Sequence, residues 1–189
     1  ISDRVVVLDA GEPLRTGSPS DVRDDPAVLE AYLGATSFQG RARAEVWQGK
    51  MLATLSTREL QAGYGAAPVL NGLKLDVYPG QMVAVLGANG AGKTTALRAI
   101  TGLLDVHEGD ITKGSIMFED ERIDGKDPSA IVRMGIAQVL EGRRIFAEMS
   151  VEENLRTGAF TNTDRGASST ARDRVMELFP VLQDREKDT

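Results

Sequence analysis

The sequence GANGAGKTT, residues 87–95, decides the fold class of this chain. It fits the pattern GxxxxGK[ST], the signature of a phosphate-binding loop. Residues 82–86, MVAVL, precede it, and their apolar, β-branched character is typical of a buried parallel strand. Residues 96–100, ALRAI, follow and favour a helix that Gly102 would end. Strand, glycine loop and helix in this order predict an α/β fold built around the loop.

The loop has the residue types that binding a chain of phosphates requires. Glycines let the backbone curl around phosphate oxygens, and the exposed N–H groups and positive helix end then point at the anion. Lys93 supplies a point charge for the β- and γ-phosphates, and the Thr94 hydroxyl is a suitable ligand for Mg²⁺. The predicted binding residues are Gly87, Asn89, Gly90, Ala91, Gly92, Lys93, Thr94 and Thr95.

Composition limits the classes of function. The chain has 189 residues, 41% hydrophobic and 26% charged, which is the balance of an ordinary globular domain with room for a small appendage. The formal net charge of −6 gives no electrostatic support for a nucleic-acid partner. The sequence has no cysteine, which excludes disulfides. It also lacks the run of about 18 apolar residues that a transmembrane helix needs, so no direct membrane insertion is expected.

The first 53 residues are expected to form a small appendage and a linker. Residues 5–8, VVVL, read as a strand that needs burial on both faces, followed by a turn at residues 9–11. A helix is predicted over residues 20–33, with a second start at Pro26. One strand and one helix cannot offset the entropy of ordering them without a larger core. Residues 35–53 show no sustained period and are interpreted as a linker.

The rest of the chain alternates predicted strands and helices around the loop. A capping box at Ser150 and Glu153 marks one helix start, and Pro180 interrupts the last helix. In that last helix we expect Val175, Leu178 and Phe179 to face inward. Strands are predicted over residues 55–64, 69–77, 115–118 and 136–140, and helices over residues 128–134, 151–158 and 170–178.

His107 is the only histidine and lies in a stretch, residues 103–114, that reads as a polar loop. Carboxylates at Asp105, Glu108 and Asp110 surround it, so a metal site is one interpretation. Metal sites need several convergent ligands, and a lone histidine far more often lies in a solvated loop. We predict the solvated loop.

Three stretches together resemble a known family. Residues 63–65 are GYG at the end of a strand, residues 87–95 form the phosphate-binding loop, and residues 139–155 read VLEGRRIFAEMSVEENL. This combination resembles the ATP-binding subunit of ABC transporters, and more narrowly the two ATPases of the branched-chain amino acid importer group. The resemblance covers roughly residues 54–189. It implies part of an ABC-type nucleotide-binding domain, with a mixed sheet and an antiparallel β subdomain, that binds ATP and Mg²⁺.

The resemblance also assigns roles to single residues. Tyr64 is similar to the aromatic residue that stacks on adenine, an interaction worth roughly 1–3 kcal/mol on a scale taken from nucleic-acid binding. Its alternative is a turn tyrosine whose ring faces the core. Glu141 falls where most members have the glutamine that approaches Mg²⁺ and the attacking water, so with Lys93 it is a catalytic candidate and with Thr94 a metal candidate. Gln138 is its rival, and we expect it inside a strand.

Residues 1–34 resemble a different part of the same family. They are similar to the C-terminal tail of the companion ATPase, so we expect a tail at 1–34, a linker at 35–53 and the N-terminal part of a second ATPase at 54–189, as in a tandem fusion. Residues 5–8 are hypothesised to supply a strand to the sheet of the phosphate-binding loop. The family's signature motif, Walker B carboxylates and switch histidine are not found in the sequence and are expected outside it.

The resemblance implies a function and partners for the intact protein. ATP binding and hydrolysis would drive uptake of branched-chain or related amino acids, with transmembrane permease subunits and a second ATPase unit in a head-to-tail dimer as partners. Such a protein lies at the cytoplasmic face of the membrane, attached through the permease. The alternatives are an ABC-type NTPase outside transport, which residues 141–155 argue against, and a fragment that binds nucleotide without hydrolysing it.

The chain as given is expected not to hydrolyse MgATP. Hydrolysis needs a group that positions or deprotonates water, and the sequence offers Lys93 and Thr94 but no recognisable base. Phosphate release from the chain should therefore equal that of a Lys93→Ala variant in a coupled assay. Turnover that disappears in Lys93→Ala would contradict this expectation.

Overall fold

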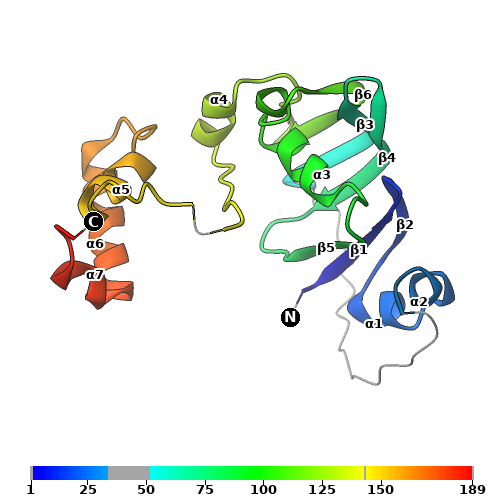
Figure 1. Ribbon diagram of the computed structural model, residues 1–189, viewed down its shortest axis with the longest axis horizontal. Helices are drawn as coiled ribbons and strands as arrows, with labels where there is room; N and C mark the ends of the chain where they lie inside the picture. The colour runs from blue at the N-terminus through cyan, green and yellow to red at the C-terminus, as the bar shows by residue number, and fades with distance from the viewer. Residues whose placement is uncertain (1, 34–51, 143, 189) are drawn as a thin grey trace. The chain divides into compact units, whose positions relative to one another are not determined.

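A computed structural model describes residues 2–33, 52–142 and 144–188 and divides the chain into two units, residues 1–128 and 129–189 (Figure 1). Most of the expected linker lies outside the described residues. Within the described ranges, no helix has the length and apolar character needed to cross a membrane.

A three-stranded sheet holds the strand of the phosphate-binding loop. Its order is β2 (Glu12–Gly17), β1 (Arg4–Asp9) and β5 (Val83–Gly87). The central strand β1 is antiparallel to β2 and parallel to β5, and its register runs from Arg4 opposite Val83 to Leu8 opposite Gly87. The hypothesis that residues 5–8 supply a strand beside the loop strand is therefore confirmed.

The packing of β1 follows from its sequence. Val6, Val7 and Leu8 are 0% exposed. Val5 and Val7 form a cluster with Val22, against which Val28 also packs. The apolar run thus predicts burial correctly, whereas β2, with only a few apolar residues, was not expected.

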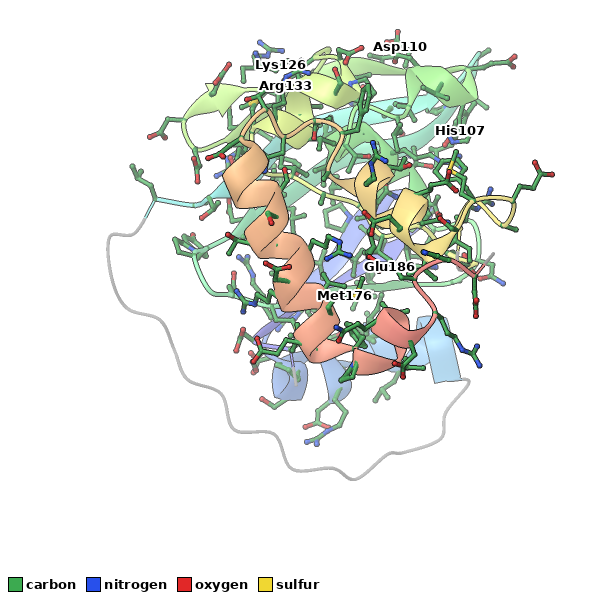
Figure 2. The ribbon with its side chains drawn as sticks, turned by 90° about the vertical axis from the view of Figure 1, so that its left-hand side faces the viewer. His107, Asp110, Lys126, Arg133, Met176 and Glu186 are labelled. Carbon is green, nitrogen blue, oxygen red and sulfur yellow. The ribbon has the colours of Figure 1, made fainter. Side chains whose placement is uncertain are left out.

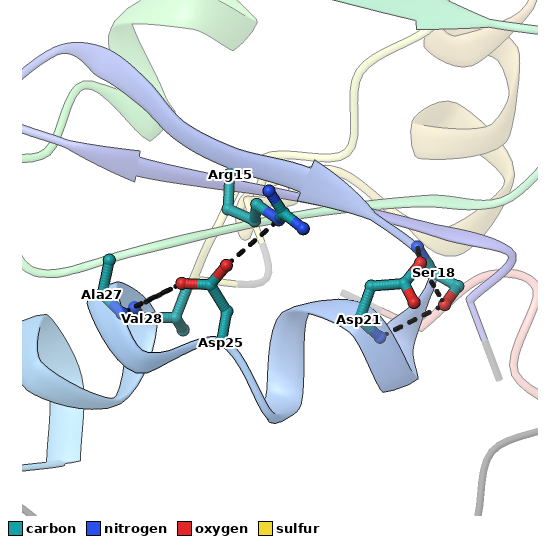
Figure 3. Close-up of polar contacts among 6 residues, drawn as sticks. All are labelled: Arg15, Ser18, Asp21, Asp25, Ala27 and Val28. Carbon is teal, nitrogen blue, oxygen red and sulfur yellow. Dashed lines mark hydrogen bonds and ion pairs between the residues drawn. The ribbon is translucent and has the colours of Figure 1, made fainter.

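Two short helices follow the hairpin, α1 (Pro19–Arg23) and α2 (Pro26–Leu33), in agreement with the second helix start expected at Pro26. Figure 3 shows how their ends are fixed. Ser18 and Asp21 form a capping box, in which the Ser18 hydroxyl and the Ser18 N–H both donate hydrogen bonds to the Asp21 carboxylate. These two bonds, the one from the hydroxyl more than the one from the N–H, hold the pKa of Asp21 below its ordinary value. Asp25 accepts the N–H of Ala27 at 2.9 Å and forms an ion pair with Arg15 at 3.2 Å.

An antiparallel sheet makes up the rest of unit 1. Its order is β4 (Ala67–Val77), β3 (Leu55–Tyr64), β6 (Gly109–Phe118) and β7 (Glu121–Arg122). The helix of the loop motif, α3 (Lys93–Ile100), lies against this sheet and buries Ala96, Ala99 and Ile100 (Figure 1). The largest fully buried residues of the sheet and the turn after it are Leu60, Leu70, Leu73, Ile116 and Ile123.

The prediction of a polar loop over residues 103–114 is wrong for residues 109–114, which belong to a strand. Residues 105–107 form a 3₁₀ helix, η1 (Asp105–His107), and β6 begins at Gly109. The free edge of β3 accounts for the difference, because it pairs Tyr64 with Gly109 and Ala62 with Ile111. His107 and Asp110 are labelled in Figure 2, and within the described residues no group of three or more His, Cys, Asp or Glu side chains could hold a metal ion.

Unit 2 is helical. It comprises α4 (Pro128–Arg133) apart from its first residue, which ends unit 1, and α5 (Val151–Gly158), α6 (Arg165–Leu178) and α7 (Pro180–Asp184). The capping box of α5 is confirmed, with the Ser150 N–H bound to Glu153 at 2.8 Å and the Glu153 N–H bound to the Ser150 hydroxyl at 3.3 Å. The Ser150 N–H, and after it the Ser150 side chain, hydrogen-bonds the Glu153 carboxylate and holds the pKa of that carboxyl below its ordinary value.

The end of the described chain also stabilises α5. The backbone carbonyls of Asp188 and Glu186 accept the N–H groups of Val151 and Glu152, each at 3.0 Å, which satisfies two donors that a helix start leaves free. Arg172 on α6 forms ion pairs with both Glu152 and Glu186. Glu186 is labelled in Figure 2.

Two expectations for unit 2 are wrong. Residues 136–140 form no strand, and Val139 is 97% exposed. A strand needs a neighbouring ladder, and no described strand pairs with this stretch. On α6, Met176, which is labelled in Figure 2, is buried and Val175 is half-buried. Leu178 is 63% exposed, and Phe179, directly after the helix, is exposed as well, so neither faces inward as expected.

The first sheet should depend strongly on the packing of β1. Leu8→Ala is expected to lower the free energy of unfolding by about 2–5 kcal/mol, because it removes a fully buried side chain and leaves a cavity. Leu14→Ala, at an exposed position of the same hairpin, should cost about 0.5 kcal/mol or less. Urea denaturation followed by circular dichroism measures both. Equal costs would show that β1 is not part of a packed core.

Candidate nucleotide-binding site

The phosphate-binding loop leaves the sheet at the carboxyl end of two parallel strands. Gly87 ends β5, and Lys93 begins α3 five residues after Ala88. Beside it, the turn after β1 leaves the same edge, since Leu8 pairs with Gly87. The crevice outside the carboxyl ends of parallel strands is where open α/β sheets bind their ligands.

The backbone of the loop has the conformation that an anion cradle requires. Gly90 and Gly92 have φ angles of 87° and 97°, a region that favours glycine. A Cβ atom at Gly92 would lie 2.7 Å from Leu70 Cδ2, so packing as well as conformation demands glycine there. At Gly90 a Cβ atom would meet nothing within 4 Å, so the loop is open on that side.

The start of α3 is available to an anion. Its N-cap is Gly92, and no side chain among the described residues caps it. The Lys93 ammonium lies over the loop and donates hydrogen bonds to the carbonyls of Gly87 at 2.6 Å and Ala88 at 2.8 Å. Free helical N–H groups beside a cation fit a phosphate chain. The exposed Thr94 is accessible to a metal ion, whereas Thr95 is buried.

Tyr64 lies at the end of β3, and its hydroxyl contacts α3. It accepts a hydrogen bond from Arg98 Nη1 at 2.9 Å and lies 3.5 Å from the Thr95 hydroxyl. The ring is half-buried. The structure therefore brings Tyr64 and the loop helix together within unit 1. Arg98 was not predicted as part of the site, although the spacing of Thr95 and Arg98 places both on one face of a helix.

Glu141 and its rival Gln138 belong to unit 2. Glu141 is exposed, and its backbone carbonyl accepts a hydrogen bond from Arg144 Nε at 3.3 Å. Gln138 is half-buried but lies outside any strand, contrary to expectation. Tyr64 thus contacts α3, the helix that carries Lys93 and Thr94, while the roles of Glu141 and Gln138 stay predictions.

The residues of unit 1 fit ATP with a metal ion of the Mg²⁺ type. The loop offers backbone donors, a lysine and a threonine hydroxyl but no cluster of carboxylates among the described residues. Mg²⁺ keeps several waters and is commonly held by one or two protein ligands and by substrate phosphates.

Comparisons with known proteins agree with this geometry. A family model described as ABC transporter matches residues 70–188, and one described as branched-chain amino acid ATP-binding cassette transporter matches residues 16–36. The chain is 40% identical over 131 residues to the high-affinity branched-chain amino acid transport ATP-binding protein BraG of Pseudomonas aeruginosa, covering 69% of this chain and 54% of BraG. It is 35% identical over 134 residues to LivG of Escherichia coli, which bears the same description, covering 64% and 51%.

A solved structure described as the ATP binding subunit of an ABC transporter superposes with a TM-score of 0.59 at 28% identity, covering 71% of this chain and 53% of that one. The predicted fold class, an incomplete ABC-type nucleotide-binding domain, is confirmed. The chain spans about half the length of the curated relatives it matches. Since the first family model covers more than half of its residues, the chain belongs to the ABC transporter family.

Proposed function

We propose that the chain is the ATP-binding part of a transporter subunit that couples ATP binding and hydrolysis to the uptake of branched-chain or related amino acids. The observation that carries ATP binding is the loop itself, with two glycines at positive φ, an uncapped helix start and the Lys93 ammonium over the loop. The kind of cargo is supported by the descriptions of BraG and LivG, both branched-chain amino acid transport proteins.

Each residue of the loop has a role in this proposal. The backbone N–H groups around Gly90 and Gly92 hydrogen-bond phosphate oxygens, and Lys93 turns from its loop carbonyls to the β- and γ-phosphates. Thr94 offers its hydroxyl to Mg²⁺, which neutralises charge on the phosphates when bound. Glu141 is proposed as a further carboxylate for the metal or for the attacking water.

Tyr64 is proposed to hold the adenine ring. The hydrogen bond from Arg98 holds the Tyr64 hydroxyl against α3. The ring is therefore already oriented, and stacking on adenine would cost little further side-chain entropy. Stacking on such a face does not depend on the pattern of hydrogen bonds of the base. The core-facing alternative for this ring makes no contribution to nucleotide affinity.

The partners in this proposal are transmembrane permease subunits and a second ABC ATPase unit in a head-to-tail dimer. The protein would then be peripheral, at the cytoplasmic face of the membrane. For residues 1–189 alone, we propose nucleotide binding without turnover, in line with the expectation from the sequence. Copurification with permease subunits tests the transport role against an ABC-type NTPase of another process.

Lys93→Ala should weaken ATP binding by about tenfold or more, because one charge-assisted hydrogen bond contributes about 1.5–3 kcal/mol. Isothermal titration calorimetry with MgATP measures the change. Lys74→Ala is the matched control, because this exposed lysine of β4 forms an ion pair with Glu59, away from the loop. Equal affinities of the two variants would count against the proposed site.

Two substitutions at Tyr64 separate stacking from hydrogen bonding. If the ring stacks on adenine, Tyr64→Ala should weaken ATP binding by about fivefold or more, while Tyr64→Phe should stay close to wild type. The same calorimetric titration applies. An equal loss in both variants would instead assign the effect to the hydroxyl and its contact with Arg98.

A further inference from the structure

Three segments that are far apart in the sequence meet at the base of the phosphate-binding loop. They are the turn between β1 and β2, residues 69–71 of β4, and Gly92 at the start of α3. The parallel register of β1 and β5 explains the meeting, because it brings the turn after β1 to the sheet edge at which the loop begins.

Asn71 of β4 hydrogen-bonds the turn through both its backbone and its side chain. Ala10 and Gly11 are the two central residues of the hairpin, with φ angles of 46° and 83°, as a type I′ connection requires. The carbonyl of Gly11 accepts the Asn71 N–H at 2.9 Å, and the carbonyl of Ala10 accepts Asn71 Nδ2 at 3.3 Å. One residue thus fixes both carbonyls of the turn.

The turn and the loop pack on the same short stretch of β4. Gly11 is buried, and a Cβ atom there would lie only 1.8 Å from the carbonyl oxygen of Val69. A Cβ atom at Gly92 would lie 3.4 Å from that same oxygen, 3.6 Å from Gly11 Cα and 2.7 Å from Leu70 Cδ2. Gly92 is therefore enclosed by β4 and by the N-terminal turn together.

We propose that the Ala10-Gly11 turn, locked by Asn71, is a positioning element of the phosphate-binding loop. Gly11 and Asn71 act through Gly92, whose φ angle of 97° sets the direction of the N–H groups at the start of α3. The consequence for nucleotide binding rests on the proposed function, whereas the effect on the geometry of the loop does not.

Gly11→Ala and Asn71→Ala test the proposal in the full chain. The first forces the turn away from Val69, and the second removes only the side-chain hydrogen bond to Ala10 and so keeps the fold. Gly125→Ala is the matched control, since Gly125 has a φ angle of 79° in the same unit but open space around its Cβ position. It carries the same backbone strain without a contact to the loop.

Two measurements separate the positioning role from the nucleotide site. Amide resonances of Gly90, Gly92 and Lys93, recorded by heteronuclear NMR without nucleotide, should shift in Gly11→Ala and Asn71→Ala but not in Gly125→Ala. Calorimetry should show ATP affinity reduced by about tenfold in Gly11→Ala and by less in Asn71→Ala, the scale of one lost hydrogen bond to a charged group.

The outcomes are distinct. Shifted loop resonances with lower ATP affinity support the whole proposal. If the loop resonances shift in the two variants but the wild-type chain does not bind ATP, the positioning role is kept and the proposed function is removed. Loop resonances that match those of Gly125→Ala in both variants overturn the positioning role, whatever the affinity. If Gly11→Ala does not fold, Asn71→Ala alone decides.

Discussion

Backbone pairing between β1 and β5 is the constraint on which the first unit depends. The loop strand β5 needs a ladder for its N–H and C=O groups, and within the described residues β1 supplies it over five consecutive pairs. The buried valines of β1 add the hydrophobic stabilisation that five backbone pairs would not provide alone. The strand before the loop is therefore held by a distant part of the sequence.

The same pairing explains why β5 is only partly buried. Met82 and Leu86 are 56% and 48% exposed, although the run 82–86 predicts burial on both faces. In the part of the chain that the structure describes, β1 pairs with one edge of β5 and no strand with the other. An apolar run specifies that a strand prefers burial, but the neighbours that bury it are set by the rest of the fold.

Local signals were sufficient for much of the fold. The capping box at Ser150 involves residues three apart, so its hydrogen bonds form wherever the helix forms. The helix after the glycine loop and the strand over residues 55–64 were predicted for similar reasons. Where a neighbouring strand decides whether a segment becomes a strand, the sequence patterns missed one strand and predicted another that does not form. Residues 109–114 became a strand because β3 had a free edge, and residues 136–140 did not, because no described strand pairs with them.

The candidate site also combines features that local sequence predicts with features that depend on distant segments. The motif names the glycines, Lys93 and Thr94 without any knowledge of the fold, because phosphate chemistry requires them at fixed spacing. What holds them does not follow from spacing. Gly92 packs on Gly11 and Leu70, and Tyr64 reaches Arg98, only because the register of two sheets places these residues together. Nine consecutive residues therefore supply the candidate binding groups of this loop, while the geometry of the loop depends on β1, β4 and β5, which come from three parts of the chain.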